Sequence, residues 1–172
     1  MERRNITNEF LKECIADALI QLLKTKPFDE ITITQITDLA GVGRSTYYRN
    51  FTSKEDVLSY KLYILGLRWL LKERLSSDMD SEELLKKYCC FVYEIRDLLT
   101  LLYQNGQTNV LIYSLYKYLG PKEGEDKRVA LRKAGLVFGG FGILYEWLKS
   151  GMEEEPDELA QLLIEGWREL RE

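Results

Sequence analysis

The chain has 172 residues, of which 45% are hydrophobic and 30% charged, with three cysteines and no histidine. This is the composition of a globular protein with one or two compact units. The lack of histidine excludes His-based catalytic triads and His-ligated zinc. Three cysteines, two of them adjacent, do not make a disulfide framework. Without a signal-peptide stretch or a run of about 18 apolar residues, we expect a cytoplasmic protein with no membrane association.

The net charge of −4 is unevenly distributed along the chain. Residues 1–55 carry eight basic and eight acidic side chains, so the whole net negative charge falls on residues 56–172. Proteins that bind DNA neutralise phosphates with Lys and Arg. The overall net charge therefore argues against a nucleic-acid partner. A prediction of DNA binding has to depend on where individual basic residues are placed.

The first third of the chain predicts two helices joined by a connector. Apolar residues recur at three- and four-residue intervals from residue 7 to 24, which indicates an amphipathic helix. The β-branched segment 28–33 has no neighbouring strand to pair with, so we interpret it as a connector. Thr34 suits the N-cap of the next helix. We expect Ile36, Leu39 and Ala40 to form the buried face of that helix.

A glycine turn at 41–43 and a second short helix over 44–51 complete the pattern of a helix-turn-helix. Tyr47 and Phe51 lie four residues apart and are expected to face the core with Val42. The remaining side chains of this helix are polar or basic and are left outside. Such a helix enters the major groove by its first turn, where Arg suits guanine and a Thr methyl group suits thymine. The expected base readers are Arg44, Ser45 and Thr46, and the expected phosphate contacts are Tyr48, Arg49, Asn50 and Lys54.

The rest of the chain predicts further helices. They cover 54 to about 75, 82 to about 102 as one or two helices, 107–119, 127–149, and a last helix from Pro156. No other strand signal occurs, so the expected fold class is all-α. We expect an N-terminal three-helix helix-turn-helix DNA-binding domain over 1–55 and a C-terminal helical regulatory and dimerisation domain over 56–172.

Residues 7–60 resemble the TetR (tetracycline repressor-like) family of bacterial transcription regulators. The motif residues are Phe28, Ile31, Thr32, Ile33, Ile36, Ala40, Gly41, Val42, Ser45, Thr46, Tyr47, Tyr48, Phe51, Lys54, Glu55 and Leu58. The resemblance implies that Thr34, Tyr48, Asn50 and Lys54 touch phosphates and that Arg44, Ser45 and Thr46 approach bases. The family often has a small hydroxyl residue where Gly43 stands, so this chain lacks that helix cap.

The C-terminal third also resembles one branch of the family, which includes regulators similar to the activator of dihydroxyacetone kinase genes. The residues concerned are 138–152, Pro156, Leu159 and Ala160. The resemblance implies a homodimer in which the last two helices of each subunit form a four-helix bundle. Small and large apolar residues agree with such an interface, or alternatively with packing inside one subunit: Gly135, Phe138, Gly139, Phe141, Gly142, Leu163 and Trp167. Two-fold symmetry predicts a palindromic operator.

The middle of the chain is rich in tyrosine, which offers an apolar wall with a polar tip. In the resembling family this region forms an effector pocket, for which the candidates here are Tyr63, Tyr88, Tyr103 and Tyr113; ordinary helix packing is the alternative. Cys89 and Cys90 are likewise open to two interpretations, as packing residues or as a thiol sensor near Lys86 and Lys87.

These features predict a sequence-specific DNA-binding transcriptional regulator, and more specifically a repressor controlled by a small-molecule effector. An activator or co-regulator whose C-terminal domain binds a protein partner, and a helical adaptor that does not bind DNA, are the alternatives. No phosphate loop, metal-ligand set or nucleophile elbow is visible. We therefore expect no enzymatic activity, no metal and no cofactor.

Overall fold

The computed structural model describes the backbone of residues 2–73 and 80–169 and the side chains of 7–73, 80 and 82–166. Within these residues the chain forms helices only, as the all-α prediction requires. Their order is α1 (Glu2–Leu23), η1 (Phe28–Glu30, a 3-10 turn), α2 (Ile33–Ala40), α3 (Arg44–Asn50), α4 (Lys54–Glu73), α5 (Ser81–Glu94), α6 (Arg96–Gln104), α7 (Thr108–Leu119), α8 (Lys127–Lys149) and α9 (Pro156–Glu169).

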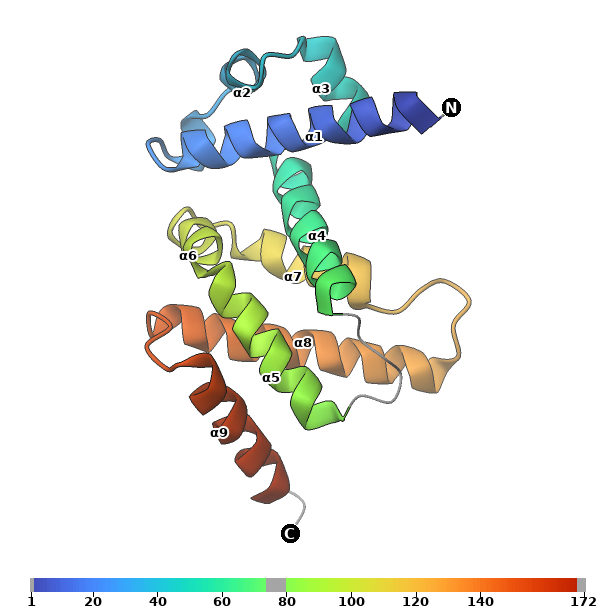
Figure 1. The fold of residues 1–172 in the computed structure, drawn as a ribbon, viewed down its shortest axis with the longest axis vertical. Helices are drawn as coiled ribbons and strands as arrows, with labels where there is room; N and C mark the ends of the chain where they lie inside the picture. Colours follow the sequence, from blue (N-terminus) through green and yellow to red (C-terminus); the bar gives the residue numbers. More distant parts are fainter. Residues whose placement is uncertain (1, 74–79, 170–172) are drawn as a thin grey trace.

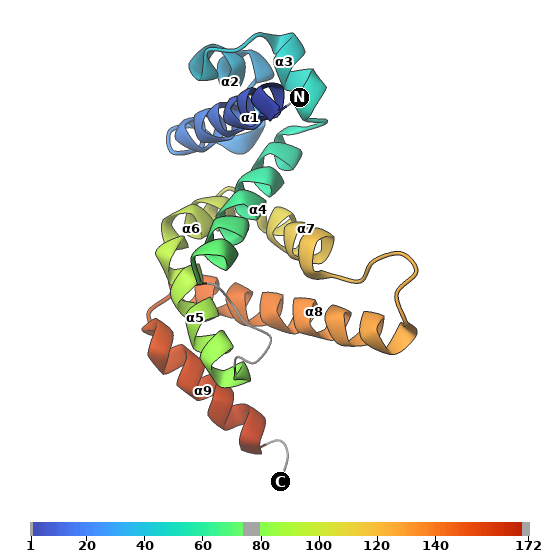
Figure 2. The same ribbon diagram turned by 45° about the vertical axis from the view of Figure 1, so that its right-hand side comes forward.

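The helices form an elongated molecule with a small upper unit and a larger body (Figure 1). Helices α1, α2 and α3 make the upper unit, and α4 descends from it into the body formed by α5 to α9 (Figure 2). The boundary expected between residues 55 and 56 falls in the first turn of α4, which continues without interruption to Glu73. One helix therefore belongs to both parts.

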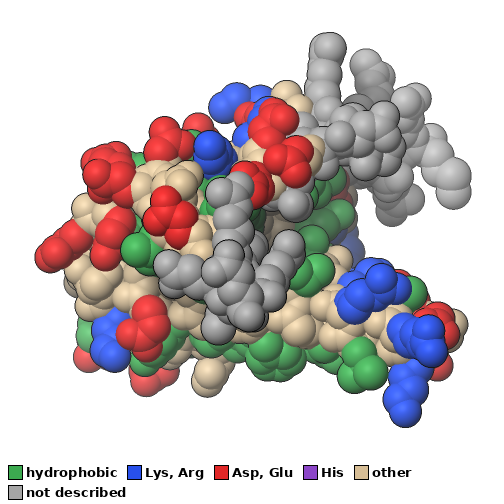
Figure 3. Space-filling model, turned by 90° about the horizontal axis from the view of Figure 1, so that it is seen from below, with side chains coloured by type: hydrophobic (Ala, Val, Ile, Leu, Met, Phe, Trp, Pro, Cys, Tyr) green, Lys and Arg blue, Asp and Glu red, His purple; other side chains and the backbone are tan. Residues whose placement is uncertain are grey.

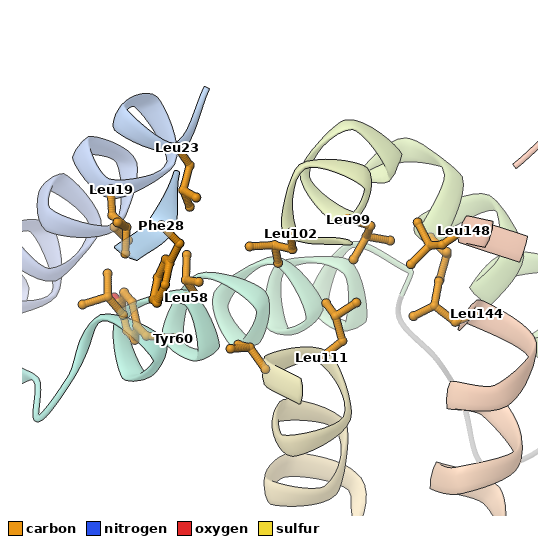
Figure 4. Close-up of a cluster of buried hydrophobic side chains, with 14 of the residues drawn as sticks. Leu19, Leu23, Phe28, Leu58, Tyr60, Leu99, Leu102, Leu111, Leu144 and Leu148 are labelled. Atoms are coloured by element: carbon orange, nitrogen blue, oxygen red, sulfur yellow. The ribbon is translucent and has the colours of Figure 1, made fainter. Parts of the chain in front are cut away.

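Four consecutive residues of α4, Val57 to Tyr60, are buried because α1 covers the helix on one side and α7 on another. The core is continuous along this helix from the upper unit into the body (Figure 4). Its labelled members are Leu19, Leu23, Phe28, Leu58, Tyr60, Leu99, Leu102, Leu111, Leu144 and Leu148.

Polar contacts also attach α1 to α4. The carboxylates of Glu9, Glu13 and Asp17 lie four residues apart, on one stripe of α1. The Glu9 carboxylate accepts a hydrogen bond from the Tyr60 hydroxyl at 3.0 Å. Asp17 pairs with Lys61 and Glu13 with Arg68, each at 2.5 Å. Exposed ion pairs of this kind contribute little each, but together they fix the direction in which α1 crosses α4.

Side-chain caps explain where several of the helices begin. The Asp126 carboxylate accepts from the backbone N–H groups of Arg128 and Val129 and so begins α8 at Lys127. The expected cap of α2 was wrong by two residues. Thr32 is the N-cap and forms a capping box with Gln35, whereas Thr34 lies inside the helix. The helix 54–73 likewise begins with a bond from the Asp56 N–H to the Ser53 hydroxyl.

The expected buried face of α2 was wrong for Leu39, which is 45% exposed. Ile36 is fully buried, and Ile33 and Ala40 pack against the core from the same side. At 3.6 residues per turn Leu39 lies about 90° from the centre of that face. The apolar side chain of Leu39 was therefore not enough to predict whether this residue is buried.

Candidate nucleic-acid interface

The helix-turn-helix is built by α2, a glycine turn and α3. Gly41 adopts a left-handed conformation with φ of 66°, which glycine tolerates without steric cost. The Val42 N–H then donates to the Thr37 carbonyl at 3.0 Å and closes the end of α2. Gly43 precedes α3 with an extended φ of −77° and offers no side-chain cap. The absence of a side-chain cap at the start of α3 is therefore confirmed. Of the two glycines in this turn, Gly41 is the one whose backbone conformation favours glycine.

The inner side of α3 is fixed by aromatic packing. Tyr47 is fully buried, and its ring lies 6.0 Å from that of Phe51 and 5.5 Å edge-on from that of Tyr48. Val42 packs against the same core. The expected core positions Val42, Tyr47 and Phe51 are thus confirmed. Burial raises the pKa of Tyr47 to about 12, so its phenol is neutral at physiological pH.

The outer side of α3 carries the expected base readers. Arg44 and Ser45 are exposed, and Thr46 is half-buried. All three stand in the first turn of a helix that lies at the far upper end of the molecule (Figure 1). A convex end with small side chains at its first turn is the shape that approaches base edges in a major groove.

The expected phosphate contacts differ in how freely their side chains are presented. Thr34, Tyr48 and Arg49 are exposed, Tyr48 by 62%. The Asn50 amide donates one of its two N–H groups to the Thr46 carbonyl at 2.8 Å, which leaves the other N–H available. The exposed members of this surface are therefore one aromatic side chain (Tyr48), two with aliphatic hydroxyls (Thr34 and Ser45) and two guanidinium side chains (Arg44 and Arg49).

Lys54 has a role inside the protein that its sequence position did not reveal. Its ammonium donates to the carbonyl oxygens of Phe28 and Ile31, at 2.5 and 2.9 Å, and lies 4.3 Å from the centre of the Phe28 ring. These bonds tie the start of α4 to the connector before α2. An ammonium has three donors, so one is left for a phosphate.

A cavity of about 430 Å³ lies in the body and is lined by residues of α4, α5, α6, α7 and α8. Tyr63 and Tyr88 line it, together with residues outside that set of four tyrosines, including Trp69, Phe91 and Ser114. Tyr103 and Tyr113 lie outside it: Tyr103 packs against Tyr145 with ring centres 6.0 Å apart, and Tyr113 is 57% exposed. A serine within an otherwise apolar helix face, as at Ser114, is the signal that could have indicated the cavity.

The two adjacent thiols are not activated. Cys89 is buried, and burial raises its pKa to about 11. Cys90 is exposed, but partial burial and the nearby Asp157 carboxylate also raise its pKa. Thiols of this kind stay protonated at neutral pH, whereas a sensor cysteine needs a thiolate. These pKa directions favour the packing interpretation.

The fold and the exposed α3 define a helix-turn-helix protein of the class that binds DNA. Residues 15–60 match the model of a family described as "Bacterial regulatory proteins, tetR family". This match covers the C-terminal part of α1, the helix-turn-helix and the start of α4, and it supports a DNA-binding transcription regulator of that family. No curated protein matches the chain.

The resemblance of the C-terminal third to the dihydroxyacetone kinase activator branch is not supported, because the family match ends at residue 60. In the part of the chain that the structure describes, no helix combines the length and apolar character needed to cross a bilayer. The same residues contain no group of three or more acidic or Cys side chains arranged to hold a metal ion.

Proposed function

We propose that the protein is a sequence-specific transcriptional repressor that acts as a homodimer under the control of a small-molecule effector. The observation that carries this proposal is the polar, basic outer surface of α3 at one end of the molecule, within the segment that matches the family. Residues 1–55 supply the DNA-binding unit, and residues 56–172 supply effector binding and dimerisation. A regulator of bacterial genes acts in the cytoplasm, where its DNA lies.

The proposed contacts follow from exposure and chemistry. Arg44 reaches guanine, and Ser45 and Thr46 allow the helix to approach base edges. Phosphate contacts, which position the protein without reading sequence, come from Thr34, Tyr48, Arg49, Asn50 and Lys54. The limited net charge of the upper unit makes each local cation important.

The proposed dimer uses the outward surface of α8. Gly135, Gly139 and Gly142 are exposed there, beside Phe138, which is 56% exposed. An added Cβ at any of these glycines would meet nothing within 4 Å in the single chain, so the groove they leave is open to a partner helix. Leu131 and Leu136, 64% and 74% exposed, extend the apolar surface. Hydrophobic side chains are visible on the underside of the molecule, with Lys and Arg gathered at its right-hand end (Figure 3).

Other expected interface residues contribute differently. Phe141 and Leu163 are half-buried and pack against the core of their own chain, so only part of each is available to a partner. The side chain of Trp167 lies outside the described residues. The proposed interface therefore centres on the outer face of α8. Helix α9 packs against α5, and its Leu162 is 65% exposed.

Effector control is supported by the path of α4. This helix supplies Leu62, Tyr63 and Gly66 to the cavity wall and is attached to α1 by the contacts of Glu9, Glu13 and Asp17. The buried hydroxyls of Ser59 and Ser114, 2.9 Å apart, link α4 to α7 beside the cavity. A ligand that displaces α4 against α7 would therefore move the DNA-binding unit and change the spacing of the two recognition helices.

Repression is proposed because it is the commoner outcome in the resembling family. An activator whose body binds a protein partner has the same DNA-binding surface. A helical adaptor without DNA binding is favoured by one observation, the net charge of −4.

Selection of genomic fragments by the purified full chain, followed by sequencing, tests the proposed function. We expect enrichment of a palindrome whose half-sites lie about one helical turn, ~34–36 Å, or a multiple of it apart. A chain variant with Arg44→Ala and Thr46→Ala provides the matched control and should lose the enrichment. If the wild-type chain enriches no sequence, the adaptor is the better account.

A further inference from the structure

The residues that line the cavity in the body restrict the size and charge of the ligand it can bind. Its volume of about 430 Å³ falls within the range of small-molecule sites, roughly 300–1,000 Å³. None of the residues lining it is charged. An anion entering it would lose hydration without meeting a counter-charge, which is unfavourable. Carboxylates and other anionic effectors therefore do not fit.

Aromatic side chains form two walls of the cavity. Trp69 stacks on Phe91, with ring centres 5.0 Å apart and planes 20° apart. Tyr63 stacks on Tyr118 at 4.2 Å and 22°. All four residues line the cavity. Rings prefer offset-stacked or edge-to-face neighbours, so a ring compound gains more from these walls than a flexible chain does.

Tyr88 lines the cavity and carries a phenol that can donate a hydrogen bond. Within the described residues its hydroxyl has no hydrogen-bond partner, whereas the hydroxyl of Ser114, which also lines the cavity, is paired with Ser59. Burial raises the pKa of Tyr88 to about 12. The phenol therefore keeps its proton at physiological pH and can donate to an acceptor on a ligand.

We propose that the cavity binds an uncharged, largely apolar ring compound carrying a hydrogen-bond acceptor, such as a carbonyl group, which accepts from the Tyr88 hydroxyl. This inference rests on the proposed function, in which the cavity is the effector site. It deepens that function by naming the chemical class of the effector and the residue that recognises its polar group.

The test uses the neutral naphthalene ketone 6-propionyl-2-dimethylaminonaphthalene, whose fluorescence reports both binding and hydrogen bonding to its carbonyl. Its charged counterpart is 6-dimethylaminonaphthalene-2-sulfonate. We expect the full chain to bind the ketone saturably, with one ligand per chain, and the sulfonate at least about tenfold more weakly. Equal affinity for the two probes, or no saturable binding of the ketone, would overturn the proposal.

Two variants locate the bound probe. Gly66 lines the cavity, and a Cβ added there meets nothing within 4 Å, so Gly66→Leu adds a side chain at the cavity wall and should abolish ketone binding. Gly140→Leu makes the same exchange in α8 outside the cavity lining and should leave binding unchanged. Unaltered binding to Gly66→Leu would show that the probe lies elsewhere and would contradict the proposal.

Tyr88→Phe tests the donor. It removes a hydroxyl that has no partner among the described residues, so the fold is retained. We expect the ketone to bind about three- to tenfold more weakly and to emit at shorter wavelength, because its carbonyl loses a hydrogen bond. An unchanged emission spectrum and affinity would remove Tyr88 from the site. These measurements contain no DNA, so their failure is distinguishable from failure of the selection experiment.

Discussion

Arg44 and Thr46 are the side chains on which sequence reading is expected to depend. Replacing either with Ala should cost about 1–3 kcal/mol at the selected operator, because a base contact is lost, and should relax the preference at one base pair. Fluorescence anisotropy with operator and random duplexes measures both effects. Arg96→Ala, an exposed arginine of α6 far from α3, is the matched control. Equal loss on both duplexes would show that these residues touch only the backbone.

Lys54 should affect stability as well as DNA binding. Its ammonium holds two carbonyl oxygens of the connector before α2, and hydrogen bonds to charged groups contribute about 1.5–3 kcal/mol. We expect Lys54→Ala to lower the free energy of unfolding by about 1–3 kcal/mol in urea titrations. Lys24→Ala, an exposed lysine at the end of the α1 segment, should leave it unchanged. A stable Lys54→Ala protein with weakened DNA binding would assign this lysine to phosphate contact alone.

Tyr47 makes stability depend on alkaline pH. Burial raises its pKa to about 12, whereas an unfolded tyrosine has a pKa of about 10. Its contribution is therefore fully present below about pH 10 and is lost as pH rises toward 12, because the unfolded chain releases the proton more easily. Tyr47→Phe should reduce the loss of unfolding free energy between pH 9 and 11 by about 1 kcal/mol. The same exchange at the exposed Tyr113 should not change this loss. Equal pH profiles of unfolding free energy for the wild type and both variants would contradict the role assigned to Tyr47.

At the level of elements, boundaries marked by local chemistry could be predicted from the sequence. Asp126 and Pro156 begin α8 and α9 where expected, because capping and proline preferences act within one turn. Leu39 and Lys54 could not be placed in the same way. The burial of Leu39 depends on which side of α2 meets α1, and the contacts of Lys54 reach residues more than 20 positions away.

The residues that line the cavity could also be predicted only in part from the sequence. Its wall combines residues from α4 to α8, and periodicity within one helix does not reveal which faces meet across a space. Tyr63 and Tyr88 were predicted to line it and do so, whereas Tyr103 and Tyr113 were predicted on equal grounds and face elsewhere. Tyrosine composition indicated the region, and helix packing selected the residues.

The outward face of α8 can be tested as an element. Phe138→Glu places a charge on an exposed apolar surface, so the folded single chain should tolerate it. In a two-fold interface the change occurs twice, and the lost apolar burial alone is about 3–6 kcal/mol. Light scattering at micromolar concentration should show a shift from about 40 kDa to the 20.2 kDa chain. Tyr113→Glu, equally exposed on α7, is the control, and a dimer of the Phe138→Glu protein would exclude this face.

At the scale of the whole molecule, the positions of the DNA-binding helix and the proposed dimer surface make DNA affinity depend on dimerisation. Helix α3, which carries the proposed base readers, lies at one end of the long axis, and α8, which carries the proposed dimer surface, lies in the body (Figure 2). The cavity is lined by residues of α4 to α8. Residues 1–55 carry no net positive charge, so one recognition helix has a limited electrostatic contribution to DNA binding. Two copies held at the correct spacing raise the effective concentration of the second for its half-site.

The most direct test of this account compares two duplexes that carry the selected operator, one intact and one with a single half-site scrambled. Equilibrium titration with the full chain should give two chains on the intact duplex and an affinity about a hundredfold or more lower on the scrambled one. Equal affinity for the two duplexes, with one chain bound to each, would contradict the claim that paired recognition helices read the DNA.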